Sequence, residues 1–128
     1  MKKNKKDKGL TLIELIIVLL VIAILIGISV PIYQYFLKKA KQVEAQIALK
    51  EISKLESIYF GDHDKFSSSL SEIGFSPMHP LQYYTNITID LFPGNKFVAK
   101  AEGNIDRDPD LDVWIINETG IITHLAED

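Results

Sequence analysis

The sequence contains no cysteine among its 128 residues. A disulfide bond, a thiolate metal site and a thiol nucleophile are therefore excluded. There is also no nucleophile elbow, no Gly-rich phosphate-binding loop and no HExxH metal motif. Because no catalytic constellation is visible, we expect that the protein is not an enzyme.

Polar side chains are missing from residues 15–28. From Leu15 to Tyr33 the only polar interruption of consequence is Ser29, and this 19-residue stretch would be about 28 Å long as a helix. A bilayer has a hydrocarbon core of about 30 Å, and backbone groups in lipid must be satisfied within the segment. We therefore expect a membrane helix. Its apolar run is longer than that of a signal peptide, and bulky residues follow it where a cleaved signal has small ones, so the helix should stay in the mature protein.

Charge is distributed unevenly along the chain. Residues 1–9 hold five lysines and one aspartate, a net charge of +4. Because the whole chain carries −3, the remaining residues carry −7. The basic head predicts a cytoplasmic N-terminus by the positive-inside rule. An acidic body without basic patches argues against direct nucleic-acid binding.

The membrane segment should continue into an amphipathic helix, giving one helix from about residue 11 to 60 with Gly61 as its C-cap. Gly27 and Pro31 predict a kink or local melting. Two adjoining apolar stripes follow helical spacing: Phe36, Ala40, Val43 and Ile47, then Ala48, Ile52, Leu55 and Tyr59. Charged residues are expected on the opposite side: Lys38, Lys39, Lys41, Glu44, Lys50, Glu51, Lys54 and Glu56.

The rest of the chain predicts a small β-sheet. A polar connection spans residues 62–80, in which 68–73 could form a short helix. Strands are expected at Tyr83–Leu91, Phe97–Glu102, Asp112–Ile116 and Ile121–Leu125. Turn residues at 93–95 and 117–120 separate the first two and the last two strands. The predicted fold class is α+β, a long N-terminal helix packed by a roughly four-stranded antiparallel meander.

Glu14 is an acidic residue at the start of the apolar stretch. A carboxylate within an apolar helix is costly, so such residues usually pair and mark a functional site. The alternative is a helix N-terminal acid at the headgroup boundary that complements the helix dipole.

The segment from Lys8 to Leu15, KGLTLIEL, resembles the processing site of type IV prepilins and pseudopilins. A short basic leader ends in glycine, a hydrophobic residue follows, and glutamate is the fifth residue after the glycine. Pro31, 22 residues past Gly9, stands where these proteins commonly carry proline. Leu10 departs from the commoner phenylalanine or methionine, but the change is conservative.

The resemblance implies how the chain is processed. A membrane-embedded prepilin peptidase would cut between Gly9 and Leu10 and methylate the new amine. The domains would then be a cleaved leader (1–9), a transmembrane or filament-core helix (10–35) and a globular pilin-like domain (36–128). That domain would comprise an amphipathic helix (36–60), a connecting loop (62–80) and a sheet (81–128).

The resemblance also implies partners and places. The subunit would wait in the bacterial inner membrane, in contact with lipid, and inner-membrane machinery would assemble it into a helical homo-oligomer. The filament would be an extracellular pilus or a periplasmic pseudopilus. Leu10, Glu14 and Pro31 are the predicted assembly residues. The cationic amine of Leu10 would meet a neighbour's Glu14 and set the stagger, while apolar packing supplies the association.

No cofactor is expected, with one exception to be tested. Asp106, Asp108, Asp110 and Asp112 alternate in a loop, and calcium takes 6–8 oxygen ligands from such loops. The glycine and terminal glutamate of an EF-hand are absent, and a solvated acidic loop with Arg107 as internal partner is the alternative.

Three functions stay open at this point. The first is a pilin whose surface filament serves adhesion, motility or DNA uptake. The second is a pseudopilin of a type II secretion system, which calcium in the aspartate loop would favour. The third is a membrane-anchored binding domain that never polymerises.

Overall fold

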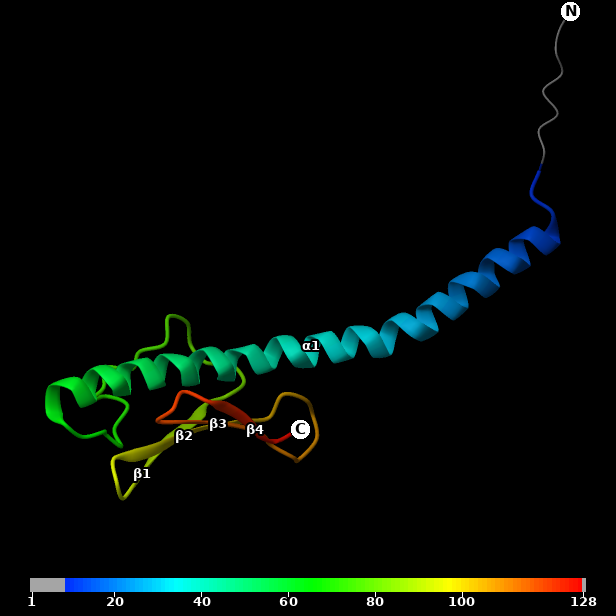
Figure 1. The fold of residues 1–128 in the computed structure, drawn as a ribbon. Helices are drawn as coiled ribbons and strands as arrows, with labels where there is room; N and C mark the ends of the chain where they lie inside the picture. Colours follow the sequence, from blue (N-terminus) through cyan, green and yellow to red (C-terminus); the bar gives the residue numbers. More distant parts are fainter. Residues whose placement is uncertain (1–8, 128) are drawn as a thin grey trace, which may run out of the picture. The chain divides into compact units, whose positions relative to one another are not determined.

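The computed structural model describes residues 9–127. Its elements run in the order α1 (Leu12–His63), β1 (Asn86–Phe92), β2 (Lys96–Gly103), β3 (Asp112–Asn117) and β4 (Ile122–Ala126) (Figure 1). A long N-terminal helix followed by a four-stranded antiparallel sheet is the predicted α+β arrangement, so the fold class is confirmed. The chain divides after Phe36 into two units.

The first unit holds the apolar part of α1. Every large apolar side chain from Leu12 to Phe36 is between 46% and 75% exposed, so none is covered by the other residues that the structure describes. An 18-residue window of α1 has a mean hydropathy of 3.2 and is long and apolar enough to cross a membrane.

Pro31 lies inside α1, and helical structure continues through Gly27 and Pro31. Proline cannot donate to the carbonyl four residues earlier, which here belongs to Gly27. The Ser29 hydroxyl donates to the Leu25 carbonyl at 2.6 Å, which satisfies the hydroxyl without a partner outside the helix. Because α1 is continuous through residues 27–31, the alternative of local melting there is wrong.

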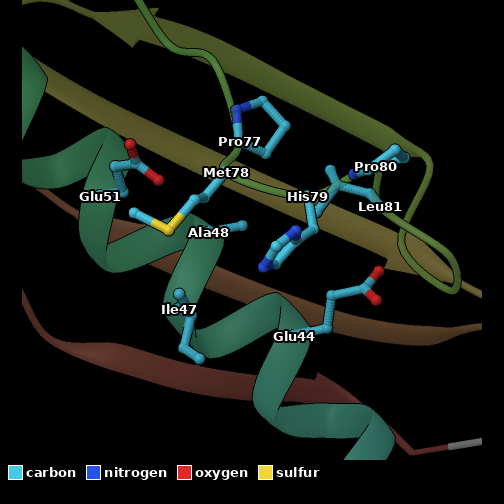
Figure 2. A pocket seen from close by; sticks show the side chains of 9 residues that line it. All are labelled: Glu44, Ile47, Ala48, Glu51, Pro77, Met78, His79, Pro80 and Leu81. Carbon is cyan, nitrogen blue, oxygen red and sulfur yellow. The ribbon is translucent and has the colours of Figure 1, made fainter.

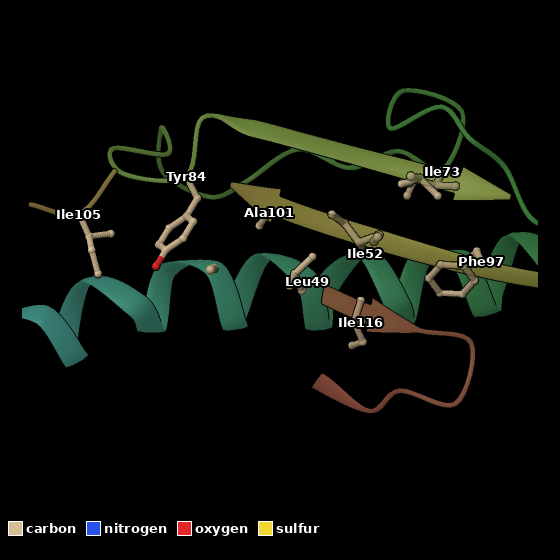
Figure 3. Close-up of a cluster of buried hydrophobic side chains, with 11 residues drawn as sticks. Leu49, Ile52, Ile73, Tyr84, Phe97, Ala101, Ile105 and Ile116 are labelled. Carbon is tan, nitrogen blue, oxygen red and sulfur yellow. The ribbon is translucent and has the colours of Figure 1, made fainter. Parts of the chain in front are cut away.

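The core of the second unit lies between the later part of α1 and the sheet (Figure 3). On the helix, Ala45, Leu49 and Ile52 are fully buried at spacings of four and three, which places them on one stripe. They pack with a cluster of sheet residues: Phe97, Ala99, Ala101 and Ile116. The alanines on both sides leave room for close approach of helix and sheet.

The apolar stripes of α1 are only partly as predicted. Ala48, Ile52, Leu55 and Tyr59 belong to or border the buried side of the helix. Val43 and Ile47 of the other predicted stripe are 45% and 62% exposed, and Phe36 is 64% exposed. The buried side instead includes Gln42 and Glu56: Gln42 Nε2 donates to Asp112, and one carboxylate oxygen of Glu56 accepts the Ser67 N–H.

The helix ends at His63, three residues later than expected. Gly61 is helical, and the C-cap predicted there is wrong. Asp64 takes the left-handed conformation (φ 55°) just past the end, and its N–H donates to the Phe60 carbonyl at 2.8 Å. An aspartate tolerates this conformation better than most non-glycine residues, so it can stop the helix without a glycine.

The short helix considered at 68–73 is a single turn over residues 70–74. Gly74 (φ 72°) donates to the Ser71 carbonyl at 3.1 Å, and Phe75 donates to the Leu70 carbonyl at 2.9 Å. These two bonds form a Schellman ending. They bring Leu70 and Phe75 together against the core.

The sheet is a meander in the order β1-β2-β3-β4 with all pairs antiparallel. Its four strands lie at the predicted places. The first begins at Asn86 rather than Tyr83, because the N–H groups of Tyr83 and Tyr84 donate to the Glu44 carboxylate instead of to a strand. Left-handed Gly94 and Asn95 form the predicted turn between β1 and β2.

Gly103 is the point of closest approach between β2 and the loop that precedes β1. A Cβ at this position would lie 2.2 Å from the Tyr83 carbonyl oxygen and 2.9 Å from the Tyr84 Cα. Both atoms belong to the backbone, so they can move aside only if the loop moves.

We predict that Gly103→Ala destabilises the second unit by about 1–3 kcal/mol, the usual cost of overpacking. Thermal unfolding of the full chain in detergent, followed by the fluorescence of its single tryptophan, measures the change. Gly61→Ala is the matched control, because its Cβ meets nothing within 4 Å and alanine favours a helix. Equal melting temperatures for Gly103→Ala and the parent chain would contradict the close approach.

Candidate functional site

The predicted processing residues lie just before the helix. Gly9 and Leu10 precede α1 outside any helix or strand, and both are exposed. The bond between them is therefore accessible to an enzyme. Residues 1–8 of the predicted leader lie outside the described residues.

Glu14 caps the start of its own helix. The Thr11 N–H donates to Glu14 Oε2 at 2.8 Å, and the Glu14 N–H donates to Thr11 Oγ1 at 3.3 Å. This reciprocal pair is a capping box, which satisfies two N–H groups that a helix start leaves without partners. The T-x-x-E pattern is present in the sequence, but the sequence analysis considered only ion pairing and the helix dipole for Glu14. Only one of the two carboxylate oxygens takes part.

The acidic loop that was predicted as a calcium site is held by its own turns. The Asp106 carboxylate accepts the Asp108 N–H at 2.8 Å, and the Asp108 carboxylate accepts the Asp110 N–H at 2.9 Å. These are local turn contacts. Asp112 is fully buried at the start of β3. Within residues 9–127 no group of three or more His, Asp or Glu side chains lies together as a possible metal site, so the structure gives no support to calcium at Asp106, Asp108, Asp110 and Asp112, which stays a prediction.

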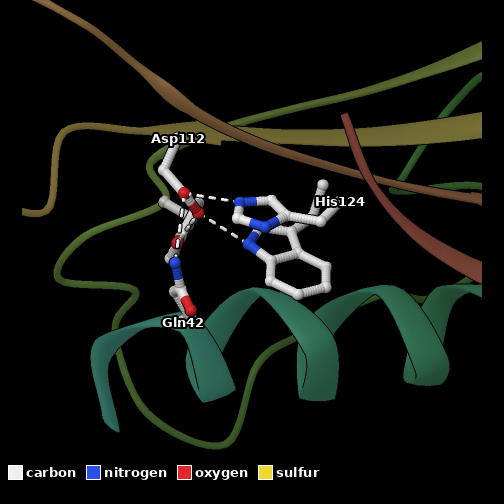
Figure 4. A network of polar contacts seen from close by, with 5 residues as sticks. Gln42, Asp112 and His124 are labelled. Atoms are coloured by element: carbon white, nitrogen blue, oxygen red, sulfur yellow. Dashed lines mark hydrogen bonds and ion pairs between the residues drawn. The ribbon is translucent and has the colours of Figure 1, made fainter. Parts of the chain in front are cut away.

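Asp112 is the centre of a buried polar network (Figure 4). Its Oδ1 accepts from Gln42 Nε2 at 3.3 Å and pairs with His124 Nε2 at 2.7 Å. Its Oδ2 accepts from Trp114 Nε1 at 2.6 Å and from the Tyr84 hydroxyl. The rings of Trp114 and His124 stack with centroids 4.1 Å apart. One carboxylate therefore joins α1, the loop before β1, and both C-terminal strands.

Two further charged residues of α1 hold the loops. Glu44 Oε1 accepts the Tyr83 and Tyr84 N–H groups at 2.9 and 3.1 Å. Lys41 Nζ donates to the Ile105 carbonyl at 2.5 Å and lies 5.2 Å from the centre of the Tyr83 ring. Both residues were predicted on the solvated side of the helix, and that prediction is wrong for their carboxylate and ammonium ends.

Glu56 is fully buried and only half satisfied. Its Oε2 accepts the Ser67 N–H at 3.0 Å, whereas Oε1 has no hydrogen-bond partner among the described residues. Burial raises the pKa of Glu56, the Ser67 N–H partly offsets this, and the charge of Glu72 raises the pKa further. Glu72 is close because it accepts from the Ser67 hydroxyl at 2.5 Å.

The family model for the prokaryotic N-terminal methylation motif matches residues 4–30, a range that includes Gly9, Leu10 and Glu14. The chain is 38% identical over 80 residues to the type IV major pilin protein PilA of Myxococcus xanthus. By these two findings it is similar to type IV pilins and carries their N-terminal methylation motif.

Other pilin-family relatives align over more of the chain at lower identity. Two fimbrial proteins of Neisseria meningitidis, from serogroups A and B, are 23% and 22% identical over 122 residues, which is 93% of this chain and 72% of each relative. The PilA match covers 62% of this chain but only 36% of that relative, so the chain spans little more than a third of it.

We predict that Asp112→Ala destabilises the second unit by about 3–5 kcal/mol, because it removes the shared acceptor of a buried charged network. Urea unfolding of the full chain in detergent measures the change. Asp110→Ala in the exposed loop is the control and should stay within about 0.5 kcal/mol of the parent. Equal losses of unfolding free energy in the two variants would contradict a stabilising role of the network around Asp112.

The raised pKa of Glu56 predicts that the unfolding free energy of the second unit depends on pH. Its pKa is raised above 4.5 in the folded chain, so its contribution to stability is fully present below pH 4.5 and is lost as pH rises through the folded-state pKa. Glu56→Gln cannot titrate, and its oxygen can still accept the Ser67 N–H. The unfolding free energy of the parent should therefore fall relative to that of Glu56→Gln between pH 4.5 and neutrality.

Glu51→Gln on the partly exposed side of α1 serves as the control. Its unfolding free energy should follow that of the parent across the same pH range. Parallel curves for the parent and Glu56→Gln would contradict the raised pKa of Glu56.

Proposed function

We propose that this type IV pilin-like structural subunit polymerises through α1 into a surface filament that serves adhesion, motility or DNA uptake, and that it performs no catalysis. The observation that carries the proposal is the uncovered apolar side chains from Leu12 to Phe36. Burying one Leu, Ile or Val side chain is worth roughly 1.5–3 kcal/mol. A segment with this many exposed apolar side chains must be covered by lipid or by other copies.

Lipid would cover the apolar segment first, and neighbouring subunits would cover it after assembly. In the precursor, α1 would span the inner membrane once, with the basic leader on the cytoplasmic side. Assembly by inner-membrane machinery would then exchange lipid for neighbouring helices. Since lipid chains are as apolar as these side chains, the exchange gains little from hydrophobicity and needs close packing or polar contacts to be selective.

The polar contact would come from processing. A prepilin peptidase would cut after Gly9, remove the lysine-rich leader and leave a methylated, cationic amine at Leu10. That amine would pair with Glu14 of a neighbouring subunit. Because the capping box occupies only one oxygen of Glu14, the same carboxylate can cap its own helix and receive the neighbour's amine.

Two alternatives share part of this account. A type II secretion pseudopilin would use the same helix in a short periplasmic filament, but the relatives that the chain matches are a type IV major pilin and fimbrial proteins. A membrane-anchored binding domain that stays single would leave the Gly9–Glu14 segment without a purpose. We therefore place both behind the pilin.

The decisive variant is Glu14→Gln. Glutamine at this helix position also forms a capping box, so the variant removes the charge and keeps the cap. Losing one partner of a buried ion pair costs about 3–5 kcal/mol. Because every subunit repeats the defect, we predict loss of sheared surface filaments while the subunit still accumulates in the membrane.

Thr11→Val is the matched control, since it removes the side-chain half of the cap and keeps the carboxylate charge. It should still yield filaments. The proposal fails if Glu14→Gln yields as many filaments as the parent chain, or if Thr11→Val is the variant that abolishes them.

A further inference from the structure

The second unit has an apolar groove between α1 and the loop 77–81 (Figure 2). Met78 and His79 point from the loop toward the helix. Met78 is 92% exposed and Ile47 on the helix wall is 62% exposed, although the sequence predicted Ile47 as part of a buried stripe. The apolar lining consists of Ile47, Ala48, Pro77, Met78, Pro80 and Leu81.

Two acidic residues border the groove, and their negative charge restricts which ligands are complementary to it. Glu44 uses one carboxylate oxygen to hold the Tyr83 and Tyr84 N–H groups, and Glu51 lies one helical turn beyond Ile47. A complementary ligand would therefore present apolar side chains followed by a positive charge.

The chain itself carries such a stretch. Tyr33 and Phe36 are each 64% exposed and Leu37 is 42% exposed, and they run directly into Lys38. This stretch closes the apolar segment that the proposed function packs against other copies. Every subunit inserted in the same membrane presents it parallel to its neighbours, so it is always available at high local concentration.

We propose that the groove receives the Tyr33–Lys38 stretch of a second copy of this chain, with Lys38 of that copy at Glu51. The inference rests on the proposed filament and adds a lateral contact to it. Glu51 and Lys38 are 13 positions apart along α1, whereas Glu14 and Leu10 are four apart. The copy whose Lys38 reaches Glu51 is therefore a different neighbour from the copy whose amine reaches Glu14.

The absence of cysteine permits a direct test by disulfide cross-linking. One full-length chain carries Met78→Cys, a second carries Phe36→Cys, and the two are expressed together. Filaments are oxidised before they are solubilised. A disulfide-linked dimer containing both chains is expected, and it cannot arise within one copy.

Leu125→Cys replaces Met78→Cys in the control pair. Leu125 is 63% exposed and lies on β4, an edge strand of the sheet outside the groove lining. Its yield of dimer with Phe36→Cys should be several-fold lower. Filaments that form without the Met78–Phe36 dimer would overturn the inference and leave the proposed function intact, whereas absence of filaments from the parent chain would overturn both.

A charge exchange tests the paired ends. Glu51→Lys and Lys38→Glu should each lower the yield of sheared filaments several-fold, because each places like charges at the contact. The double variant should recover most of the loss. Failure of the double variant to exceed either single variant, with all chains equally abundant in the membrane, would exclude the Glu51–Lys38 contact.

Discussion

An apolar helix that residues 9–127 leave uncovered is the constraint on which the rest of the molecule depends. From Leu12 to Phe36 the side chains are exposed, so this part of α1 cannot persist in water and must be covered by lipid or by other subunits. The Thr11–Glu14 capping box is compatible with both states, because it satisfies N–H groups at the helix start without a partner from outside. A single carboxylate can then add the charge that distinguishes a neighbouring subunit from lipid.

The second unit meets a different demand, since it must be stable with fewer than a hundred residues and without a disulfide. Polar side chains of α1 supply the ties that a disulfide would otherwise give. Glu44 holds the loop before β1, Gln42 reaches Asp112, and Asp112 joins His124 of the last strand. The C-terminal strand is thereby tied to the helix through a buried carboxylate. Glu56 is the weak member of this set, because its Oε1 has no hydrogen-bond partner among residues 9–127 and burial raises its pKa.

Much of the fold was predictable because it follows from local patterns. The apolar run gave the first half of α1, alternation and turn residues gave four strands at the right places, and Gly9 and Glu14 indicated the family.

Sequence reasoning failed where a polar residue is buried by a distant partner. Glu44 and Glu56 look like solvent-facing helix residues, and only the loops at Tyr83 and Ser67 reveal otherwise. The aspartate loop shows the same limit of sequence patterns: even spacing suggested a common ligand, while the strand register turns Asp112 inward toward His124. The exposure of Ile47 could not be predicted either, since helical period alone does not say which apolar stripe the sheet covers.

The central claim is that proteolysis after Gly9 supplies the cation that Glu14 requires in an assembled filament. Intact-mass and peptide mass spectrometry of filaments sheared from the cell surface tests it most directly. We predict that the chain in these filaments begins at Leu10 and carries a methyl group on its α-amine. A filament-forming chain that keeps its lysine-rich N-terminus, or a chain recovered only as a single membrane species, would contradict the account.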